Sequence, residues 1–336
     1  MDNIKTDFSL KKYNTFQINV SAKKYTKFST IKQLKKTLNK CNKNEILILG
    51  GGSNILLTKD INGIVLHNDI KGITILKEDK NHVFVKVGAG EVWHDFVLWS
   101  VKQNLSGIEN LALIPGSVGA SPIQNIGAYG TEVKDTIEEV IAIEIKTRKT
   151  KKFKNIECEF QYRDSIFKNR IKGEYIITEV IFKLNKFHLN ITSYGEVEKE
   201  LNELKLNANP KNISTAIINI RNRKLPNPQE LANCGSFFKN PTIETSQFNI
   251  LKRKYPNIIG YKISEKKIKL AAGWLIENAG LKGYRISDAG VHANQALVLV
   301  NYGESTGEEI LNLSKIVKNK IQTMYNIELE NEVTIL

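Results

Sequence analysis

The stretch ALIPGSVGASPIQNIGAYG, residues 112–130, most constrains what this chain can fold into. It is dense in glycine, serine and proline, yet it is also apolar. A flexible linker would be more polar, so these residues belong within the fold rather than between its parts. Because small residues let the backbone approach another group closely, the stretch predicts a loop pressed against a flat ligand.

A second glycine-rich segment, Gly50-Gly51-Gly52-Ser53-Asn54, follows a predicted buried strand over 45–49. Glycines there would let backbone N–H groups approach a pyrophosphate, which makes the segment a candidate phosphate-binding turn. It is not the dinucleotide-binding fingerprint, because the GxGxxG spacing fails and residues 55–57 predict another strand instead of a helix. An ordinary tight turn explains the run equally well.

The rest of the chain alternates between helix and strand patterns without an internal repeat. With 336 residues it has room for two or three domains. The polar, proline-bearing stretch 205–217 is a candidate domain boundary. Apolar spacing predicts helices over 31–40, 91–103, 271–279 (ended by Gly280) and 308–325, and strands over 82–87, 138–146, 175–184, 296–300 and the C-terminal ELENEVTIL.

The formal charge of +14 would favour anionic substrates, and it raises the question of a nucleic-acid partner. The lysines are spread over the whole chain, and no aromatic-basic motif accompanies them. We therefore predict no nucleic-acid partner. The densest basic run, residues 146–152, lies between two predicted strands and indicates a solvated hairpin.

No apolar run is long enough for a membrane span, and the N-terminus lacks the apolar region of a secretory signal. Cys41, Cys158 and Cys234 form no CxxC pair and have no histidine at metal-binding spacing. We therefore expect reduced thiols, no metal site and no membrane partner, in a cytoplasmic protein.

Several uncommon segments stand together in this chain. They are LGGGSN at 49–54, the 112–130 loop, YRDSIF at 162–167, GSFFKNP at 235–241, LAAGWLIENAGLKG at 270–283 and LENEV at 329–333. With these segments, nearly the whole chain resembles the flavin-dependent UDP-N-acetylenolpyruvoylglucosamine reductases of peptidoglycan synthesis, the MurB family. The segment TSYGEV, with Tyr194 and Gly195, resembles the substrate-capping loop of one form of that family.

The resemblance implies an α+β fold in three parts. Residues 1–70, rejoined by 320–336, and residues 71–210 would form an FAD-binding fold of the vanillyl-alcohol-oxidase-like type, and residues 219–319 would cover the substrate. It also implies FAD as cofactor and NADPH as co-substrate, which would reduce the flavin before the UDP-sugar nucleotide enters the same pocket. The product would be UDP-N-acetylmuramate, a cell-wall precursor that bears on cell shape, division and the cell cycle. The enzyme would be a monomer.

The implied reaction reduces an enol ether that bears a carboxylate, so it needs donors at the carboxylate and an acid at carbon. The resemblance makes Arg163 the group that grips the carboxylate through two donors. From the local sequence, an ion pair with Asp164 or another acid explains Arg163 equally well. Glu332, which the LENEV motif selects over Glu330, would donate a hydrogen bond from its protonated form. A solvated C-terminal glutamate is the alternative.

Ser236 would supply the proton to carbon, with Lys239 or a water relay assisting, and the phenylalanines that follow it would exclude water. The alternative is a turn serine that satisfies backbone groups. Asn331 stands where the resembling family usually has proline, which would leave the local backbone less rigid.

The resemblance also implies two sets of binding residues. For the sugar nucleotide they are Tyr194, Lys224, Asn240 and Gln295, with an exposed tyrosine, a solvated lysine and an Asn-Pro turn as the alternatives. For FAD they are Gly50, Gly51, Gly52, Ser53, Asn54, Pro115, Gly116, Ser117, Gly119, Ser121, Asn125, Gly127, Ala128 and Gly130.

Three further residues look reactive but receive no role. We expect His94 at a surface or interface of the predicted 91–103 helix, and His292 has no nucleophile that would form a triad with it. Cys234 is interpreted as a small buried residue. Another flavin-dependent oxidoreductase of the same fold, such as an alcohol oxidase, is the alternative function, and it would need a base in place of the Ser–Glu–Arg set.

Overall fold

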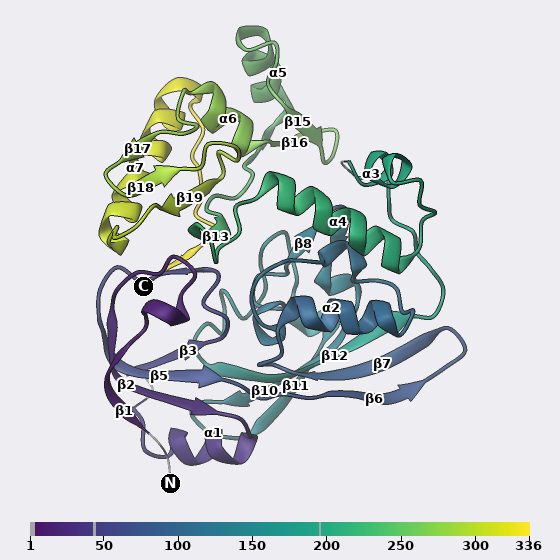
Figure 1. The fold of residues 1–336 in the computed structure, drawn as a ribbon, viewed down its shortest axis with the longest axis vertical. Helices are drawn as coiled ribbons and strands as arrows, with labels where there is room; N and C mark the ends of the chain where they lie inside the picture. Colours follow the sequence, from purple (N-terminus) through teal and green to yellow (C-terminus); the bar gives the residue numbers. More distant parts are fainter. Residues whose placement is uncertain (1–3, 43–44, 195) are drawn as a thin grey trace. The chain divides into compact units, whose positions relative to one another are not determined.

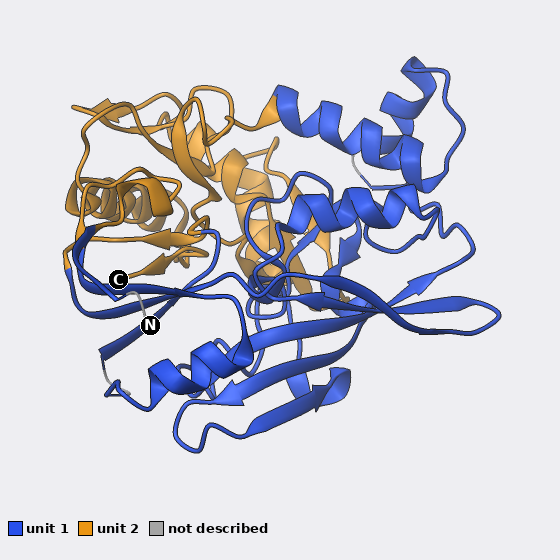
Figure 2. Cartoon of the chain, turned by 60° about the horizontal axis from the view of Figure 1, so that its bottom comes forward, with its two compact units in different colours: residues 1–8, 22–51, 61–223 blue, residues 9–21, 52–60, 224–336 orange. Residues whose placement is uncertain are grey.

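The structure, a computed structural model, describes residues 4–42, 45–194 and 196–336. Its contacts divide the chain into two compact units, which are coloured separately in Figure 2. Unit 1 comprises residues 1–8, 22–51 and 61–223, and unit 2 comprises residues 9–21, 52–60 and 224–336. Gly195, part of the predicted capping segment, lies outside the described residues. The three-part division expected above stays a prediction.

The first sheet of unit 1 has the strand order β1-β2-β5-β3, and β2 and β3 both pair in parallel with β5 (Figure 1). Helix α1 follows β2 and buries Leu34 and Leu38, which share a core cluster with Leu66 of β5. The helix predicted over 31–40 is confirmed as α1, and the strand predicted over 45–49 is confirmed as β3. The elements are β1 (Lys5–Ser9), β2 (Ser21–Phe28), α1 (Ile31–Leu38), β3 (Ile46–Leu49) and β5 (Ile61–Asn68).

The second sheet of unit 1 is antiparallel throughout, with the order β11-β10-β12-β7-β6. Pairing of Ile143 with Thr150 closes residues 146–152 into the β10–β11 hairpin that the sequence predicts. The strands are β6 (Ile73–Glu78), β7 (His82–Gly88), β10 (Ile137–Glu144), β11 (Thr150–Lys154) and β12 (Tyr175–Asn185), and a separate pair is formed by β8 (Gly127–Ala128) and β9 (Thr131–Glu132).

Helices α2 (Trp93–Lys102), α3 (Val197–Glu203) and α4 (Pro210–Lys224) share one hydrophobic core with this sheet (Figure 1). The rings of Phe96 on α2 and Phe182 on β12 lie 4.8 Å apart. Ile213 and Ile217, one helical turn apart on α4, are fully buried. Each such side chain stabilises the fold by roughly 1.5–3 kcal/mol. Residues 210–217, part of the candidate domain boundary at 205–217, therefore belong to a packed helix.

The main sheet of unit 2 has the antiparallel order β13-β19-β18-β17. Helix α7 contacts β18, β19 and α6, and its N-terminus is capped by the Thr306 hydroxyl, which accepts the N–H of Glu309 at 3.2 Å. Gly280 has φ +75°, as the predicted helix end requires. The elements are β13 (Ala232–Ser236), α6 (Ala272–Asn278), β17 (Arg285–Ile286), β18 (Ala289–Val291), β19 (Val298–Asn301) and α7 (Gly307–Tyr325).

Two smaller sheets complete unit 2. The order β14-β16-β15 joins β14 (Thr242–Glu244), β15 (Gly260–Lys262) and β16 (Lys267–Leu270), and α5 (Thr245–Lys254) contacts it. Near the C-terminus, β20 (Thr334–Ile335) pairs in parallel with β4 (Ile55–Leu56). The strand predicted over ELENEVTIL is thus regular only at its end.

None of the helices within the described ranges combines the length and the apolar character that crossing a membrane requires. Cys41, Cys158 and Cys234 are free thiols, and the last two are buried.

Candidate active site

The 112–130 loop of unit 1 is held by the segment that leads from β7 into α2. Gly119, in the loop, packs against Ala89 so closely that a Cβ on it would lie 2.5 Å from the Ala89 Cβ. Three hydrogen bonds join the two segments: Gly119 N–H to Ala89 O (2.8 Å), Val118 N–H to Glu91 O (2.8 Å) and Trp93 N–H to Gly116 O (3.0 Å). A fourth, from Trp93 Nε1–H to Leu111 O (2.9 Å), holds the residue just before the loop. We call this set of contacts the brace.

The loop is also rich in left-handed backbone. Leu113, Asn125 and Tyr129 have φ values of +59°, +44° and +47°, in a region that costs a non-glycine residue roughly 1–2 kcal/mol. Such conformations persist where the surrounding structure imposes them, and they gather at functional sites. The brace lies on either side of Leu113, while the side chain of Asn125 and the carbonyl of Tyr129 are held by hydrogen bonds of their own.

The two glycine-rich segments singled out in the sequence lie against each other in unit 1. A Cβ on Gly50 would lie 2.5 Å from Ser117 Oγ, and a Cβ on Gly51 would lie 2.9 Å from Gly116 Cα. Because Gly51 and Pro115 are themselves exposed, a ligand can reach backbone on this surface. A side chain on either glycine would prevent that close approach.

Other residues predicted to contact the cofactor make hydrogen bonds or close contacts with neighbouring protein segments. Ser121 is buried and its hydroxyl donates to Val118 O at 2.8 Å, while the Asn125 amide donates to Glu132 Oε2 and to Gln161 O, both at 2.9 Å. In unit 2, a Cβ on Gly52 would lie 2.0 Å from Tyr13 O. A contact of these residues with a cofactor stays a prediction.

Arg163 points at the same loop from the turn between β11 and β12. Its guanidinium donates to Gly127 O and, at 3.5 Å, to Asn125 O, and its own backbone is left-handed at φ +55°. Asp164, weighed above as its ion-pair partner, accepts from the Asn169 amide at 2.8 and 2.7 Å. Arg163 is therefore fixed by the backbone of the candidate cofactor loop.

Arg221, on α4, interacts electrostatically with Arg163 and Tyr129. This residue was missed in the sequence analysis. Within the described residues, its buried Nε atom has no hydrogen-bond partner. Burial lowers the pKa of Arg221, the neighbouring charge of Arg163 lowers it further, and Tyr129 opposes that change. The spacing of Ile213 and Ile217 places Arg221 on the buried face of α4, and this signal could have identified it.

The predicted capping segment lies next to the end of the loop. A Cβ on Gly130 would lie 3.3 Å from Tyr194 Cβ, and the Tyr194 side chain is about half exposed. Burial raises the pKa of Tyr129, on the other side of Gly130, and the charge of Arg221 counteracts this. Unit 1 thus brings two arginines and two tyrosines to one loop.

In unit 2, the segments that carry Ser236 and Glu332 pair with each other. Glu332 N–H donates to Phe237 O at 2.8 Å, Lys239 N–H donates to Glu330 O at 2.9 Å, and Phe238 lies opposite Asn331 between them. Burial and the charge of Glu332 raise the pKa of the Cys234 thiol on β13. Two of the three predicted catalytic residues therefore come together.

The surroundings of Ser236 differ from those of an ordinary turn serine. Asn233 makes the turn's side-chain contact, because its Oδ1 accepts the N–H of Gly235 at 2.8 Å. Ser236 is half-buried between Gly235, with φ +74°, and the buried Phe237. Within the described part of the chain, no hydrogen bond engages Ser236 Oγ. The hydroxyl is therefore available to a ligand.

The remaining predicted site residues of unit 2 have mixed surroundings. Lys239, considered above as a helper of Ser236, forms an ion pair with Glu330 at 3.0 Å. Asn240 Oδ1 accepts the N–H of Ala272 at 2.9 Å, which orients the amide and leaves its N–H groups to other partners. Gln295 is half-buried, and Lys224 is exposed at the last position of α4.

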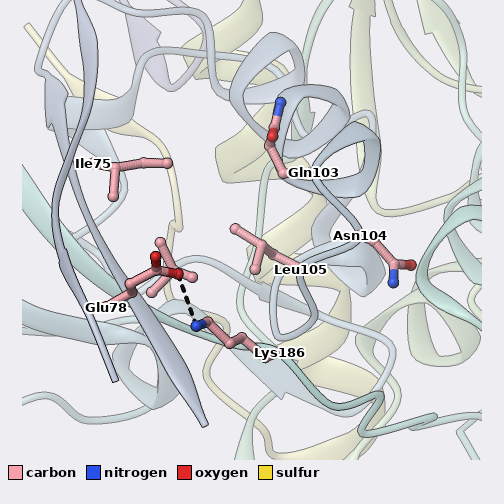
Figure 3. Close-up of a pocket in the computed structure, with 7 residues that line it drawn as sticks. Ile75, Glu78, Gln103, Asn104, Leu105 and Lys186 are labelled. Carbon is pink, nitrogen blue, oxygen red and sulfur yellow. Dashed lines mark ion pairs between the residues drawn. The ribbon is translucent and has the colours of Figure 1, made fainter. Parts of the chain in front are cut away.

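A cavity of about 320 Å³ lies elsewhere in unit 1, between the β6–β7 hairpin and the end of α2 (Figure 3). Lys186 and Glu78 form an ion pair of 2.7 Å at its wall. No residue predicted for the site lines it, so it is not the candidate active site. Its lining residues are Ile75, Glu78, Val83, Gln103, Asn104, Leu105 and Lys186.

Comparisons with known proteins match the parts of the chain that contain the segments described above. Residues 227–336 match a family model described as UDP-N-acetylenolpyruvoylglucosamine reductase, C-terminal domain, and residues 22–147 match one described as FAD binding domain. A UDP-N-acetylenolpyruvoylglucosamine reductase from Flavobacterium johnsoniae is 53% identical, over 99% of both chains. Proteins of the same name from Amoebophilus asiaticus (45%, over 99% of both chains) and Pseudomonas fluorescens Pf-5 (43%, over 98% of both chains) are also similar.

Among solved structures, that of UDP-N-acetylenolpyruvylglucosamine reductase (MurB) from Thermus caldophilus is similar, with a TM-score of 0.68 and 23% identity. The alignment covers 100% of this chain and 98% of that chain. The α+β fold with an FAD-binding part, expected from the sequence, is confirmed by this match and by the FAD-binding model.

Proposed function

Because the chain belongs to the UDP-N-acetylenolpyruvoylglucosamine reductase family, we propose that it reduces UDP-N-acetylglucosamine enolpyruvate to UDP-N-acetylmuramate with NADPH as the electron donor. Membership makes it an FAD-dependent oxidoreductase of peptidoglycan synthesis. The donor, the hydride step, the proton source and a cytoplasmic location are parts of the proposal.

The residues of the 112–130 loop fit an FAD. Gly51 and Pro115 expose backbone that a Cβ would otherwise crowd, and Gly50 and Gly51 pack on Ser117 and Gly116. When bound, FAD would supply hydride transfer from NADPH to the terminal carbon of the enolpyruvyl group. The loop's own part is to bind and orient the cofactor through backbone groups, since small residues allow that approach.

Arg163 and Arg221 would hold the negative charge that develops on the substrate. The charge of Arg163 is one of the causes that lower the pKa of Arg221, so the two side chains interact electrostatically. Two neighbouring cations repel, and an anion between them removes the repulsion. An arginine also matches a carboxylate with two parallel donors. We assign Arg163 to the substrate carboxylate and Arg221 to the support of that charge.

Ser236 would donate its proton to the carbon next to the carboxylate, and Glu332, in its protonated form, would donate a hydrogen bond to the carboxylate. The observation that carries this proposal is the pairing of their two segments, through Glu332 N–H and Phe237 O, around a serine hydroxyl without a partner in the described chain. Buried Phe237 and Phe238 would keep water from the proton that is transferred.

Tyr194, Lys224, Asn240 and Gln295 would bind the sugar nucleotide. A diphosphate takes cationic and hydroxyl donors, which the lysine and the tyrosine supply. The amide of Asn240 is oriented by its bond to Ala272 N–H, so that its donors face other partners.

The test separates the two half-reactions under anaerobic conditions by following the flavin absorbance of purified enzyme. We expect Ser236→Ala to leave flavin reduction by NADPH nearly unchanged and to slow reoxidation by the enolpyruvyl substrate by at least about 10²-fold, because a positioned acid is lost. Cys234→Ala is the matched control, since that thiol is buried on the same strand and has no proposed role.

Equal loss of both half-reactions in Ser236→Ala would mean a folding or binding defect, and an unchanged reoxidation rate would remove the serine from the mechanism. Reoxidation by oxygen alone, without response to the enolpyruvyl substrate, would favour the alternative oxidase.

A further inference from the structure

His94, expected from the sequence at a surface or interface, lies in the first turn of α2. It is half-buried, and its Nδ1 accepts the backbone N–H of Leu113 at 3.0 Å. Leu113 is the residue of the 112–130 loop with φ +59°. The histidine therefore bonds directly to the backbone of a residue in a conformation that a leucine adopts at a cost.

This contact adds to the brace near the start of the loop. Trp93, the neighbour of His94, bonds to Leu111 O on one side of Leu113 and to Gly116 O on the other. All four hydrogen bonds of the brace have a backbone carbonyl as acceptor, and a carbonyl does not titrate. The contact to Leu113 instead depends on a ring nitrogen that loses its lone pair when the ring is protonated.

We propose that His94 is a positioning residue for the flavin: in its neutral form it holds Leu113, and with it the 112–130 loop, in the conformation that binds FAD, and its protonation releases that hold. The inference rests on the proposed placement of FAD at this loop. It goes beyond the reductase activity because it assigns a pH-dependent step of cofactor binding to a residue that need not touch cofactor or substrate.

Burial favours the neutral form of His94, because it is the main influence on the pKa of the ring and lowers it. Asp95, on the same helix, raises the pKa, and the charge of Arg221 on α4 lowers it. An acceptor at Nδ1 places the single ring proton on Nε2. At neutral pH the ring can therefore accept from Leu113, and the contact is lost only under acid conditions, below the ordinary histidine pKa of about 6.5.

The test measures FAD binding to the FAD-free protein, by quenching of flavin fluorescence, between about pH 5 and 8. We expect His94→Ala to weaken FAD binding by about fivefold to tenfold at pH 8, the effect of losing one net hydrogen bond. His94→Asn should restore the affinity, since Asn Oδ1 lies near the position of the histidine Nδ1 and always accepts. Its affinity should also not fall in acid, whereas that of the unchanged protein should.

Two controls make the outcomes distinct. His188→Asn removes an exposed histidine whose ring contacts the Asn104 side chain, and it should leave the pH profile unchanged. Pro115→Glu places an anion on the exposed part of the loop and should weaken binding of the FAD pyrophosphate. If Pro115→Glu weakens FAD and His94→Ala does not, His94 has no positioning role, and the FAD site stands.

If neither variant alters FAD affinity, the placement of FAD at this loop is wrong, and the inference falls with it. If His94→Ala does not fold, the comparison of His94→Asn with the unchanged protein decides: the same acid-dependent loss of FAD in both would overturn the proposal.

Discussion

Glu330 and Glu332 are two residues apart on the chain, but their surroundings differ. Glu330 is exposed and its carboxylate lies 3.0 Å from Lys239 Nζ. Glu332 is half-buried, next to the segment of Ser236. A surface ion pair such as the first contributes only about 0–1 kcal/mol, so Glu330 has the features of an ordinary surface residue. This difference in burial supports the choice of Glu332 over Glu330, which the sequence motif suggested.

The two glutamates allow a matched test of the protonated role. Glu332→Ala removes the proposed donor and should slow flavin reoxidation by the enolpyruvyl substrate by about 10²–10³-fold. Glu332→Gln keeps a neutral donor of the same size and should retain most of that rate. Glu330→Ala should behave like the unchanged enzyme. The rates come from anaerobic stopped-flow absorbance; Gln as damaging as Ala at position 332 would exclude donation from a protonated carboxyl.

At individual residues, the sequence predicted a role only where the residue stands in a recognisable motif. Arg163, Ser236 and Glu332 each stand in a distinctive motif, so each could be proposed without a structure. Arg221 and His94 have no such motif. Their importance comes from neighbours that are distant in sequence, Arg163 and Tyr129 for the first and Leu113 for the second. A hydrogen-bond acceptor for one particular backbone N–H is a property of the folded chain alone.

At the scale of elements, periodic apolar patterns predicted correctly wherever packing follows them. The helix expected over 91–103 is α2 (Trp93–Lys102), and the helix expected over 308–325 is α7 (Gly307–Tyr325). Polarity is a weaker guide than apolar spacing. The candidate domain boundary at 205–217 includes the first residues of α4, of which Ile213 and Ile217 are buried, and the boundary itself stays a prediction. The strand predicted over ELENEVTIL is regular only at Thr334–Ile335, and Asn331 forms an isolated bridge with Phe238.

The segment around Asn331 gives a prediction at this scale. Glu332 N–H and Lys239 N–H make the bonds on either side of the Phe238–Asn331 pair, so Asn331 occupies a position without a ladder bond of its own. Its buried Oδ1 has no hydrogen-bond partner among the described residues. Asn331→Pro removes that atom and restricts the unfolded chain.

We therefore expect Asn331→Pro to raise the free energy of unfolding by about 0.4–1 kcal/mol, as measured by thermal unfolding of the FAD-free protein. Both half-reactions should keep their rates. A lower unfolding temperature would show that the Asn331 N–H or side chain makes a bond that the fold needs.

At the scale of the whole molecule, the proposed catalytic residues are divided between the two units. Arg163 belongs to unit 1, and Ser236 and Glu332 belong to unit 2, so only assays on the complete chain test all three together. The charge of +14 suits a substrate with a diphosphate and a carboxylate. Composition could predict this preference for anions, but it could not single out the enolpyruvyl sugar nucleotide, because that specificity depends on a few oriented donors.

One measurement tests the central claim most directly. The purified protein, with FAD bound, is reduced by NADPH without oxygen, then mixed with UDP-N-acetylglucosamine enolpyruvate in D₂O, and the product is analysed by mass spectrometry and NMR. We predict that NADPH bleaches the flavin and that one mole of substrate per mole of reduced flavin restores its colour. UDP-N-acetylmuramate should carry deuterium at the carbon next to the carboxylate. A flavin that NADPH cannot reduce, or that only oxygen reoxidises, would contradict the account.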